Sequence, residues 1–244
     1  MLAMLAVGAS AQSIPLEGLS FAKKIKLARA GDDTAQLAIG MHYEAGDQAE
    51  KDVQQAARWY REATLKGNIE AQYRLAKLIS KGGRGLTADK VAAVTLFQAG
   101  AEKGHAMSQN ELGLRYQNGE GIDVDMVEAA RWFQKAVDQG YAPAEVNLGL
   151  LRVRGQGVPR DYGIAINLFQ DAAKRGDAWA MNNLGSMYEM GWGVAKDLQK
   201  AREYYRMALS KGNKMAQSNL ARLEAAGTST ATIAPEPDLR STAN

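Results

Sequence analysis

The sequence contains no cysteine, and this absence excludes several classes of protein at once. A chain without cysteine has no disulfide framework and no cysteine-ligated zinc or iron–sulfur site. Proline is also scarce, at five residues in 244, and glycine does not recur at every third position, so a collagen-like chain is excluded. What the sequence does have is glycine, 25 residues of it, and its placement proves informative.

Neither sign of charge predominates in the chain. The 30 basic and 27 acidic residues leave a net charge of +3, which does not favour a nucleic-acid partner. The sequence also lacks a run of about 20 apolar residues, the length that a transmembrane helix requires. We therefore expect no nucleic-acid binding and no insertion of the mature chain into a membrane.

The first residues are short of positive charge but otherwise resemble a secretory leader. Residues 2–11 carry no charge and end in Ala9-Ser10-Ala11, which is a small-x-small cleavage pattern. This pattern predicts that residues 1–11 are a partial signal peptide and that the protein is periplasmic or secreted. The alternative is a cytosolic leader and a cytoplasmic protein.

A glycine recurs along the chain at a nearly constant interval. The intervals between its successive members are 36, 37, 36, 36 and 36 residues, and the longer one contains an extra residue in the loop 82–85. A period of this length indicates a repeat architecture. The six marker glycines are Gly31, Gly67, Gly104, Gly140, Gly176 and Gly212.

Each repeat contains two helical segments separated by a glycine turn. Positions 4, 8 and 9 after the marker glycine are small, apolar and small, and they lie on one face of a first helix. The small residue at position 9 allows a second helix to approach closely. After the turn, which reads Gly-x-Gly in three repeats, an aspartate stands where the second helix needs an N-cap. These aspartates are Asp52, Asp89, Asp125, Asp161 and Asp197.

These features resemble the Sel1-like repeat, a relative of the tetratricopeptide repeat, most clearly in the fifth repeat at residues 180–212. The resemblance extends from Gly31 to about Leu223. It implies an all-α fold, a right-handed α/α superhelical solenoid of about five helix–turn–helix repeats plus capping helices. It also implies a non-catalytic scaffold for protein–protein interaction, acting peripherally in processes of the bacterial envelope. Because the chain lacks cysteine, it lies outside the disulfide-stapled secreted branch of the family.

The repeat register also predicts how the chain is divided. Residues 12–30 are expected to form a linker and a capping helix, residues 31–226 the solenoid, and residues 227–244 a disordered tail. The last helix, in the half repeat 212–226, is expected to turn Lys214, Arg222 and Glu224 toward water. The complete repeats are predicted at 31–66, 67–103, 104–139, 140–175 and 176–211.

In related solenoids the first helix of each repeat lines a concave groove. By that analogy, the outward positions form a wall for a protein or peptide partner, apolar in its middle and flanked by amides and charges. For Val146 and Leu150, packing between adjacent helices fits the helical spacing equally well. The predicted partner-binding residues are Tyr73, Lys77, Asn110, Leu114, Val146, Leu150, Val153, Trp179, Asn182 and Met190.

No catalytic, cofactor or metal site is expected. The Gly-x-Gly turns recur at one position of several repeats, so we interpret them as structural turns rather than phosphate sites. Asp123 and Asp125 lack the other ligands of a calcium loop. His42 and His105 occupy different repeat positions, and neither belongs to a zinc-binding His-Glu-x-x-His motif. The alternative function is a cell-wall-acting enzyme or enzyme subunit of the periplasm, which would need clustered acid–base residues.

Overall fold

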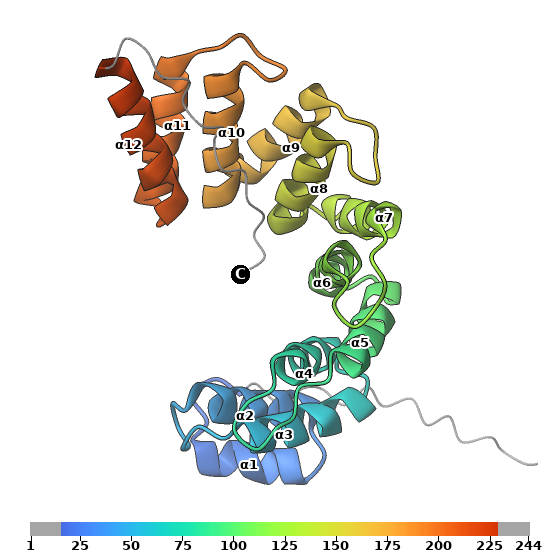
Figure 1. Ribbon diagram of the computed structural model, residues 1–244. Coiled ribbons are helices and arrows are strands. Elements are labelled where there is room, and N and C mark those ends of the chain that lie inside the picture. The colour runs from blue at the N-terminus through green and yellow to red at the C-terminus, as the bar shows by residue number, and fades with distance from the viewer. Residues whose placement is uncertain (1–15, 229–244) are drawn as a thin grey trace, which may run out of the picture. The chain divides into compact units, whose positions relative to one another are not determined.

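The computed structural model describes residues 16–228, and this part of the chain consists of helices joined by turns (Figure 1). Contacts divide the chain into two units, with the boundary between Leu96 and Phe97. The predicted leader at 1–11 lies outside the described residues, as does most of the predicted tail. The helix expected to end before Gly227 continues to Thr228.

The first unit contains four complete helices and the start of a fifth. They are α1 (Phe21–Arg29), α2 (Asp33–Ala45), α3 (Val53–Leu65), α4 (Ile69–Lys81) and the first part of α5 (Lys90–Glu102). Over residues 16–228 the sole β-type pairing is an isolated bridge between Gly83 and Leu86, inside the loop that holds the extra residue.

The second unit continues the same alternation of first and second helices. It holds the rest of α5 and then α6 (Ala106–Asn118), α7 (Met126–Val137), α8 (Ala142–Arg154), α9 (Tyr162–Lys174), α10 (Ala178–Met190), α11 (Leu198–Ser210) and α12 (Lys214–Thr228). Each helix from α7 to α12 packs against its neighbours in sequence, as stacked helical hairpins do. None of the described helices combines the length and the apolar character needed to cross a membrane.

The predicted aspartate caps are confirmed. The carboxylate of Asp161 accepts a hydrogen bond from the backbone N–H of Ile164 at 2.9 Å, and that of Asp197 accepts from the N–H groups of Gln199 and Lys200. Asp52, Asp89 and Asp125 cap α3, α5 and α7 in the same way. Each cap satisfies N–H groups that the first turn of a helix cannot satisfy itself.

The close approach predicted at position 9 is also confirmed. A Cβ atom added to Gly149 of α8 would lie 2.5 Å from Cε1 of Phe169 in α9. At Gly185 of α10 the added atom would lie 2.6 Å from the ring of Tyr205 in α11. An aromatic ring therefore lies directly on the backbone of the first helix in the four hairpins that have glycine at this position, whereas the hairpin of α4 and α5 has Ala76.

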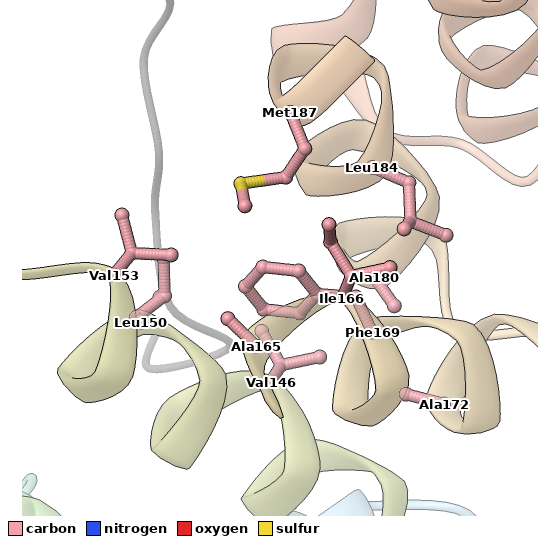
Figure 2. Close-up of a cluster of buried hydrophobic side chains, with 10 residues drawn as sticks. All are labelled: Val146, Leu150, Val153, Ala165, Ile166, Phe169, Ala172, Ala180, Leu184 and Met187. Carbon is pink, nitrogen blue, oxygen red and sulfur yellow. The ribbon is translucent and has the colours of Figure 1, made fainter. Parts of the chain in front are cut away.

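The apolar side chains of α8, α9 and α10 meet in one buried cluster (Figure 2). Val146, Leu150 and Val153 point from α8 toward Phe169 of α9 and Met187 of α10. Val146 is 0 % exposed and Leu150 is 1 % exposed. The expected apolar wall is therefore wrong at these three residues, because the next hairpin covers that side of α8 and makes it core.

The C-terminal end of the stack contains an ion pair between a buried carboxylate and a half-buried arginine. Arg222 of α12 donates to the carboxylate of Glu189 in α10, with Nη2 at 2.7 Å from Oε2. The hydroxyl of Tyr205 donates to the same Oε2 at 2.7 Å. Arg222 was expected to face water, but this charge-assisted hydrogen bonding draws it inward and ties α12 to the preceding repeat.

Position 5 of the first helix holds a buried polar side chain in four repeats. Gln36 donates from Nε2 to the carbonyl of Ala28, and Gln109 donates to the carbonyl of Ala101, both at 3.1 Å. The corresponding residue of α8 is Glu145, which accepts from Nη1 of Arg175 at 2.8 Å. Each of these hydrogen bonds joins two consecutive helices.

Candidate partner-binding groove

The structure scatters the partner-binding residues predicted for the second unit instead of gathering them on a surface. Asn110 is 5 % exposed and accepts a hydrogen bond from Nδ2 of Asn147 at 2.9 Å. Asn182 is 0 % exposed and accepts from Nδ2 of Asn219 at 3.0 Å. Both amides join the first helices of successive repeats. The prediction that they face a partner is therefore wrong.

The other predicted residues differ in exposure. Leu114 is buried in a cluster with Phe133 and Leu148, so it is also core rather than groove. Trp179 is half-buried against the cluster of Figure 2, and Met190 is half-buried at the end of α10. In α4, Lys77 is exposed and its ammonium lies 5.7 Å from the ring centre of the half-buried Tyr73. These four accessible or partly accessible residues remain predictions.

A groove of about 1250 Å³ lies entirely within the first unit. Its sides come from α1, from the loop 46–52 that joins α2 to α3, from α3, and from the loop that follows α4. A volume of this order is enough for several side chains of a bound segment. We refer to this hollow below as the first-unit groove.

The floor of the first-unit groove is apolar and aromatic. Ile25, Tyr43 and Trp59 line it and are half-buried against the core formed by Ala28, Ala35 and Ile39. Val53 and Leu78 add apolar surface from α3 and α4. Aromatic and aliphatic side chains that rest on a core and still face a hollow are the usual anchors of a binding surface.

Both of the loops that line the groove depart from the regular repeat. In the regular repeats the second glycine of the turn lies against the preceding second helix. At Gly157, for example, an added Cβ would be 2.0 Å from the carbonyl oxygen of Met126. The loop 46–52 has only Gly46 and no such close-packed second glycine. The loop 82–85 has one residue more than its counterparts. Both loops line the groove, and Gly85 of the longer loop still lies against α3, where an added Cβ would be 2.6 Å from the side chain of Gln54.

Local bonds hold the loop 46–52 in place at both ends. The N–H of Asp52 donates to the carbonyl of Tyr43 at 2.9 Å. His42 Nδ1 donates to Asp47 at 2.8 Å, while Lys24 Nζ donates to His42 Nε2 at 3.2 Å, an arrangement that requires the Nδ1–H tautomer. The hydrogen bond from His42 lowers the pKa of Asp47. This wall of the groove is thus positioned before any partner binds.

The loop that follows α4, which forms another side of the groove, is also anchored. Within it, Gly83 and Leu86 exchange backbone hydrogen bonds at 2.9 Å, which closes the loop on itself. The side chain of Gln54 in α3 donates to the carbonyl of Gly85. These bonds fix the loop against α3 and leave Lys81 and Arg84 exposed beside the groove.

The acidic residues of the groove are mostly engaged inside the protein. Glu44 accepts the hydroxyl hydrogen of Tyr60 and lies 3.6 Å from Arg74. Burial, together with the Glu44 carboxylate, raises the pKa of Tyr60, so its hydroxyl acts as a donor. Asp52 caps α3. Among the acidic groups that line the groove, only Glu50 has neither a hydrogen bond nor an ion pair within residues 16–228.

Sequence reasoning missed this groove, although the sequence carried a signal for it. The interval of 37 residues and the lone Gly46 both marked places where the repeat departs from its rule. The residues that line the groove, such as Trp59 and Lys51, occupy repeat positions that are unremarkable when taken singly.

The described residues offer little support for catalysis. They contain no group of three or more His, Asp or Glu side chains that could hold a metal ion. His105 Nδ1 lies 2.8 Å from the hydroxyl of Ser108, but Ser108 is 0 % exposed and the pair closes the first turn of α6. A substrate could not reach that hydroxyl without unfolding of the helix end.

The hairpins place the chain in the class of α-helical repeat proteins. Residues 34–68, 69–105, 106–141, 142–177 and 180–213 each match the Sel1 repeat, and the chain belongs to this family. Sel1 repeats commonly form scaffolds for protein interaction and are generally not enzymes. No curated protein matches the chain.

Solved structures of several bacterial proteins are similar to this chain. A protective antigen of uropathogenic Escherichia coli strains is 32 % identical with a TM-score of 0.77 over 86 % of this chain, which spans 45 % of the antigen. A Sel1 repeat protein from Oxalobacter formigenes is 26 % identical with a TM-score of 0.77, covering 87 % of this chain and 90 % of that one. The immunity protein Pa5087 of Pseudomonas aeruginosa, 21 % identical over 80 % of this chain and 74 % of its own, shares the fold at a TM-score of 0.53.

Proposed function

We propose that this protein is a non-catalytic scaffold that binds a segment of a protein partner in the first-unit groove. The observation that carries the proposal is the groove itself, an anchored hollow of about 1250 Å³ with an aromatic floor. Membership of the Sel1 repeat family supports a role in protein interaction. This proposal places the binding site apart from the predicted first-helix wall, whose residues lie in α4 (Tyr73 and Lys77) and in the first helices of the second unit.

We further propose that the protein acts in the bacterial envelope, as a periplasmic or secreted protein. The support is the uncharged run at residues 2–11 with its Ala9-Ser10-Ala11 ending. Fractionation of the native host, followed by sequencing of the mature N-terminus, tests this. A mature chain that begins at Gln12 in the periplasm or medium is expected, and an intact Met1 in the cytoplasm would overturn the proposal.

Photo-crosslinking in the native host tests the binding site. A benzoylphenylalanine residue replaces Arg84, which is exposed at the first-unit groove, or Lys196, which is exposed in the corresponding turn of the fifth repeat. We expect a distinct crosslinked partner from position 84 and none of that identity from position 196. An identical set of products from both positions, or no product from position 84, contradicts the proposal.

A blocking variant provides the matched control. Ala49→Trp places an indole in the first-unit groove, while Ala195→Trp places one in an exposed turn of the second unit. In each of these variants the crosslinker is kept at position 84. Ala49→Trp should abolish the product and Ala195→Trp should leave it intact, with both proteins retaining the far-UV circular dichroism of the original chain.

A further inference from the structure

The first-unit groove is rimmed by cations that have no partner. Arg29, Lys51, Lys81 and Arg84 line it, all are exposed, and none forms an ion pair or side-chain hydrogen bond within residues 16–228. These side chains come from α1, from both loops and from the end of α4, so positive charge is present on several sides of the floor. Glu50 is the one acidic group of the rim that is similarly unengaged.

The positive surface continues beyond the groove. A second hollow of about 410 Å³ shares Gln54, Gln55 and Gly85 with the groove and adds Arg58 and Arg61 of α3. Both arginines are exposed and lack an ion pair within the described part of the chain. The lining of the two hollows together holds six basic and three acidic side chains, and two of those acidic ones, Glu44 and Asp52, are engaged inside the protein.

Building on the proposed function, we infer that the occupant of the first-unit groove is an acidic segment of a protein partner, anchored by apolar side chains. The aspartate and glutamate side chains of such a segment would lie against the rim, where guanidinium and ammonium groups donate charge-assisted hydrogen bonds to carboxylates. Its apolar side chains would rest on Ile25, Tyr43 and Trp59. Because the cations are exposed, they favour encounter and selectivity, and their effect is screened by salt.

The floor is what favours a peptide over a nucleic acid. A groove for single-stranded nucleic acid would be expected to present aromatic rings in succession along a basic track, for stacking of successive bases. Here Trp59 and Tyr43 rest among Ile25, Val53 and Leu78, which suit aliphatic side chains. A cationic rim around a floor that mixes two aromatic rings with aliphatic side chains therefore points to carboxylates carried on an apolar peptide.

Binding of synthetic peptides, measured by fluorescence anisotropy, tests this inference. One fluorescein-labelled peptide alternates Asp or Glu with Leu or Tyr, and its counterpart replaces every carboxylate with the matching amide. We expect the acidic peptide to bind at least about tenfold more tightly than the amide peptide at low salt and to weaken as salt is added. A single-stranded DNA oligonucleotide of the same net charge serves as the competing ligand.

Two triple variants distinguish the effect of the rim cations on peptide affinity from the effect of the protein's net charge. Lys51→Gln, Lys81→Gln and Arg84→Gln together neutralise the rim, while Lys103→Gln, Lys211→Gln and Lys214→Gln neutralise three exposed lysines of the second unit. The rim variant should lose about tenfold or more in affinity for the acidic peptide, and the control variant less than about twofold. Equal losses in the two variants would overturn the inference, because net charge would then explain the binding.

The remaining outcomes distinguish the inference from the function on which it rests. Three results would each overturn the inference that the bound segment is acidic. They are equal affinity for the acidic and amide peptides, tighter binding of DNA at the rim, and no binding of the acidic peptide up to about 1 mM. In those cases a specific crosslink from position 84 would still support a scaffold with a different kind of partner. Sequencing of that crosslinked segment by mass spectrometry gives an independent result, and a neutral or basic segment contradicts the inference.

Discussion

At the scale of single residues, hairpin packing in the second unit depends on glycines in the first helices, which have no side chain to keep the aromatic ring of the second helix away. We predict that Gly149→Ala lowers the free energy of unfolding by about 1–3 kcal/mol, because the added methyl group would overlap the ring of Phe169. Alanine has the higher helix propensity by up to about 1 kcal/mol, so the net loss is a lower limit on the steric cost. Urea unfolding followed by far-UV circular dichroism measures the change.

A shorter partner side chain provides the control for this steric argument. Phe169→Leu removes part of the ring that an alanine at position 149 would strike. The double variant should therefore lose less free energy than the sum of the two single losses. Strictly additive losses would show that overlap with Phe169 is not the cause.

A second prediction at this scale concerns Glu145, which stands where Gln36 and Gln109 stand in other repeats. Burial raises the pKa of Glu145, and the charge of Arg175 only partly opposes this. Because its pKa is raised in the folded state, the Glu145 carboxyl contributes fully to stability at a pH below its unfolded-state pKa. That contribution is lost as the pH rises through its folded-state pKa. Glu145→Gln does not titrate and can donate to the carbonyl of Val137, as Gln109 does to Ala101.

The stability of the Glu145→Gln variant, relative to that of the original chain, should consequently increase as the pH rises from about 4 to about 7. Thermal unfolding followed at both pH values gives the difference in Tm. Arg175→Gln is the contrasting change, because it leaves a carboxylate that is 3 % exposed without its cation, at a cost of about 1–3 kcal/mol at neutral pH. A Tm difference that stays constant between the two pH values would contradict the assigned role of Glu145.

At the scale of helices, the caps decide where each element begins. We predict that Asp197→Ala destabilises the protein by about 1 kcal/mol, since the N–H groups of Gln199 and Lys200 lose their acceptor. Asp123→Ala removes an equally charged side chain that is exposed and caps no helix, so it should cost less than about 0.5 kcal/mol. Chemical denaturation of the two variants side by side makes the comparison, and equal losses would mean that charge rather than capping matters.

The same scale shows what the sequence could and could not predict. Caps such as Asp161 and close contacts such as Gly149 depend on residues a few positions apart or on one repeated spacing, so the pattern was sufficient. The surroundings of Val146 and Leu150 depend on α9 and α10, which cover that face from other parts of the chain. Helical spacing shows that two residues share a face, but it does not show whether the face is covered.

The first-unit groove was harder still to foresee, because it exists where the repeat rule fails. Ile25 belongs to the capping helix, Lys51 to a turn without its second glycine, and Arg84 to the loop with an extra residue. No common pattern links these three residues along the sequence. Their proximity comes from the packing of α1 on α2, of α2 on α3 and of α3 on α4, which only the three-dimensional structure reveals.

At the scale of the whole molecule, each repeat contacts chiefly its neighbours, so the length of the stack and the binding site should be separable. Removal of residues 140–175 deletes one repeat and keeps the register, with Gly176 in place of Gly140. Asn183 then takes the position of Asn147 opposite Asn110, and Gly185 with Tyr205 takes the place of Gly149 with Phe169. We predict a folded protein that unfolds cooperatively at a lower urea concentration and still binds the acidic peptide, because the first-unit groove lies within residues 25–85.

A deletion that breaks the repeat register also tests whether each repeat is stabilised chiefly by its neighbours in the stack. Removal of residues 140–161 takes away α8 and its turn but leaves α9, whose buried Phe169 and Ile166 would have no first helix to cover them. We expect this variant to aggregate or to lose cooperative unfolding, although it is the shorter deletion of the two. Stable, cooperative folding of the out-of-register variant would contradict the nearest-neighbour account of the stack. Loss of peptide binding by the folded in-register variant would show that the first-unit groove does not act alone.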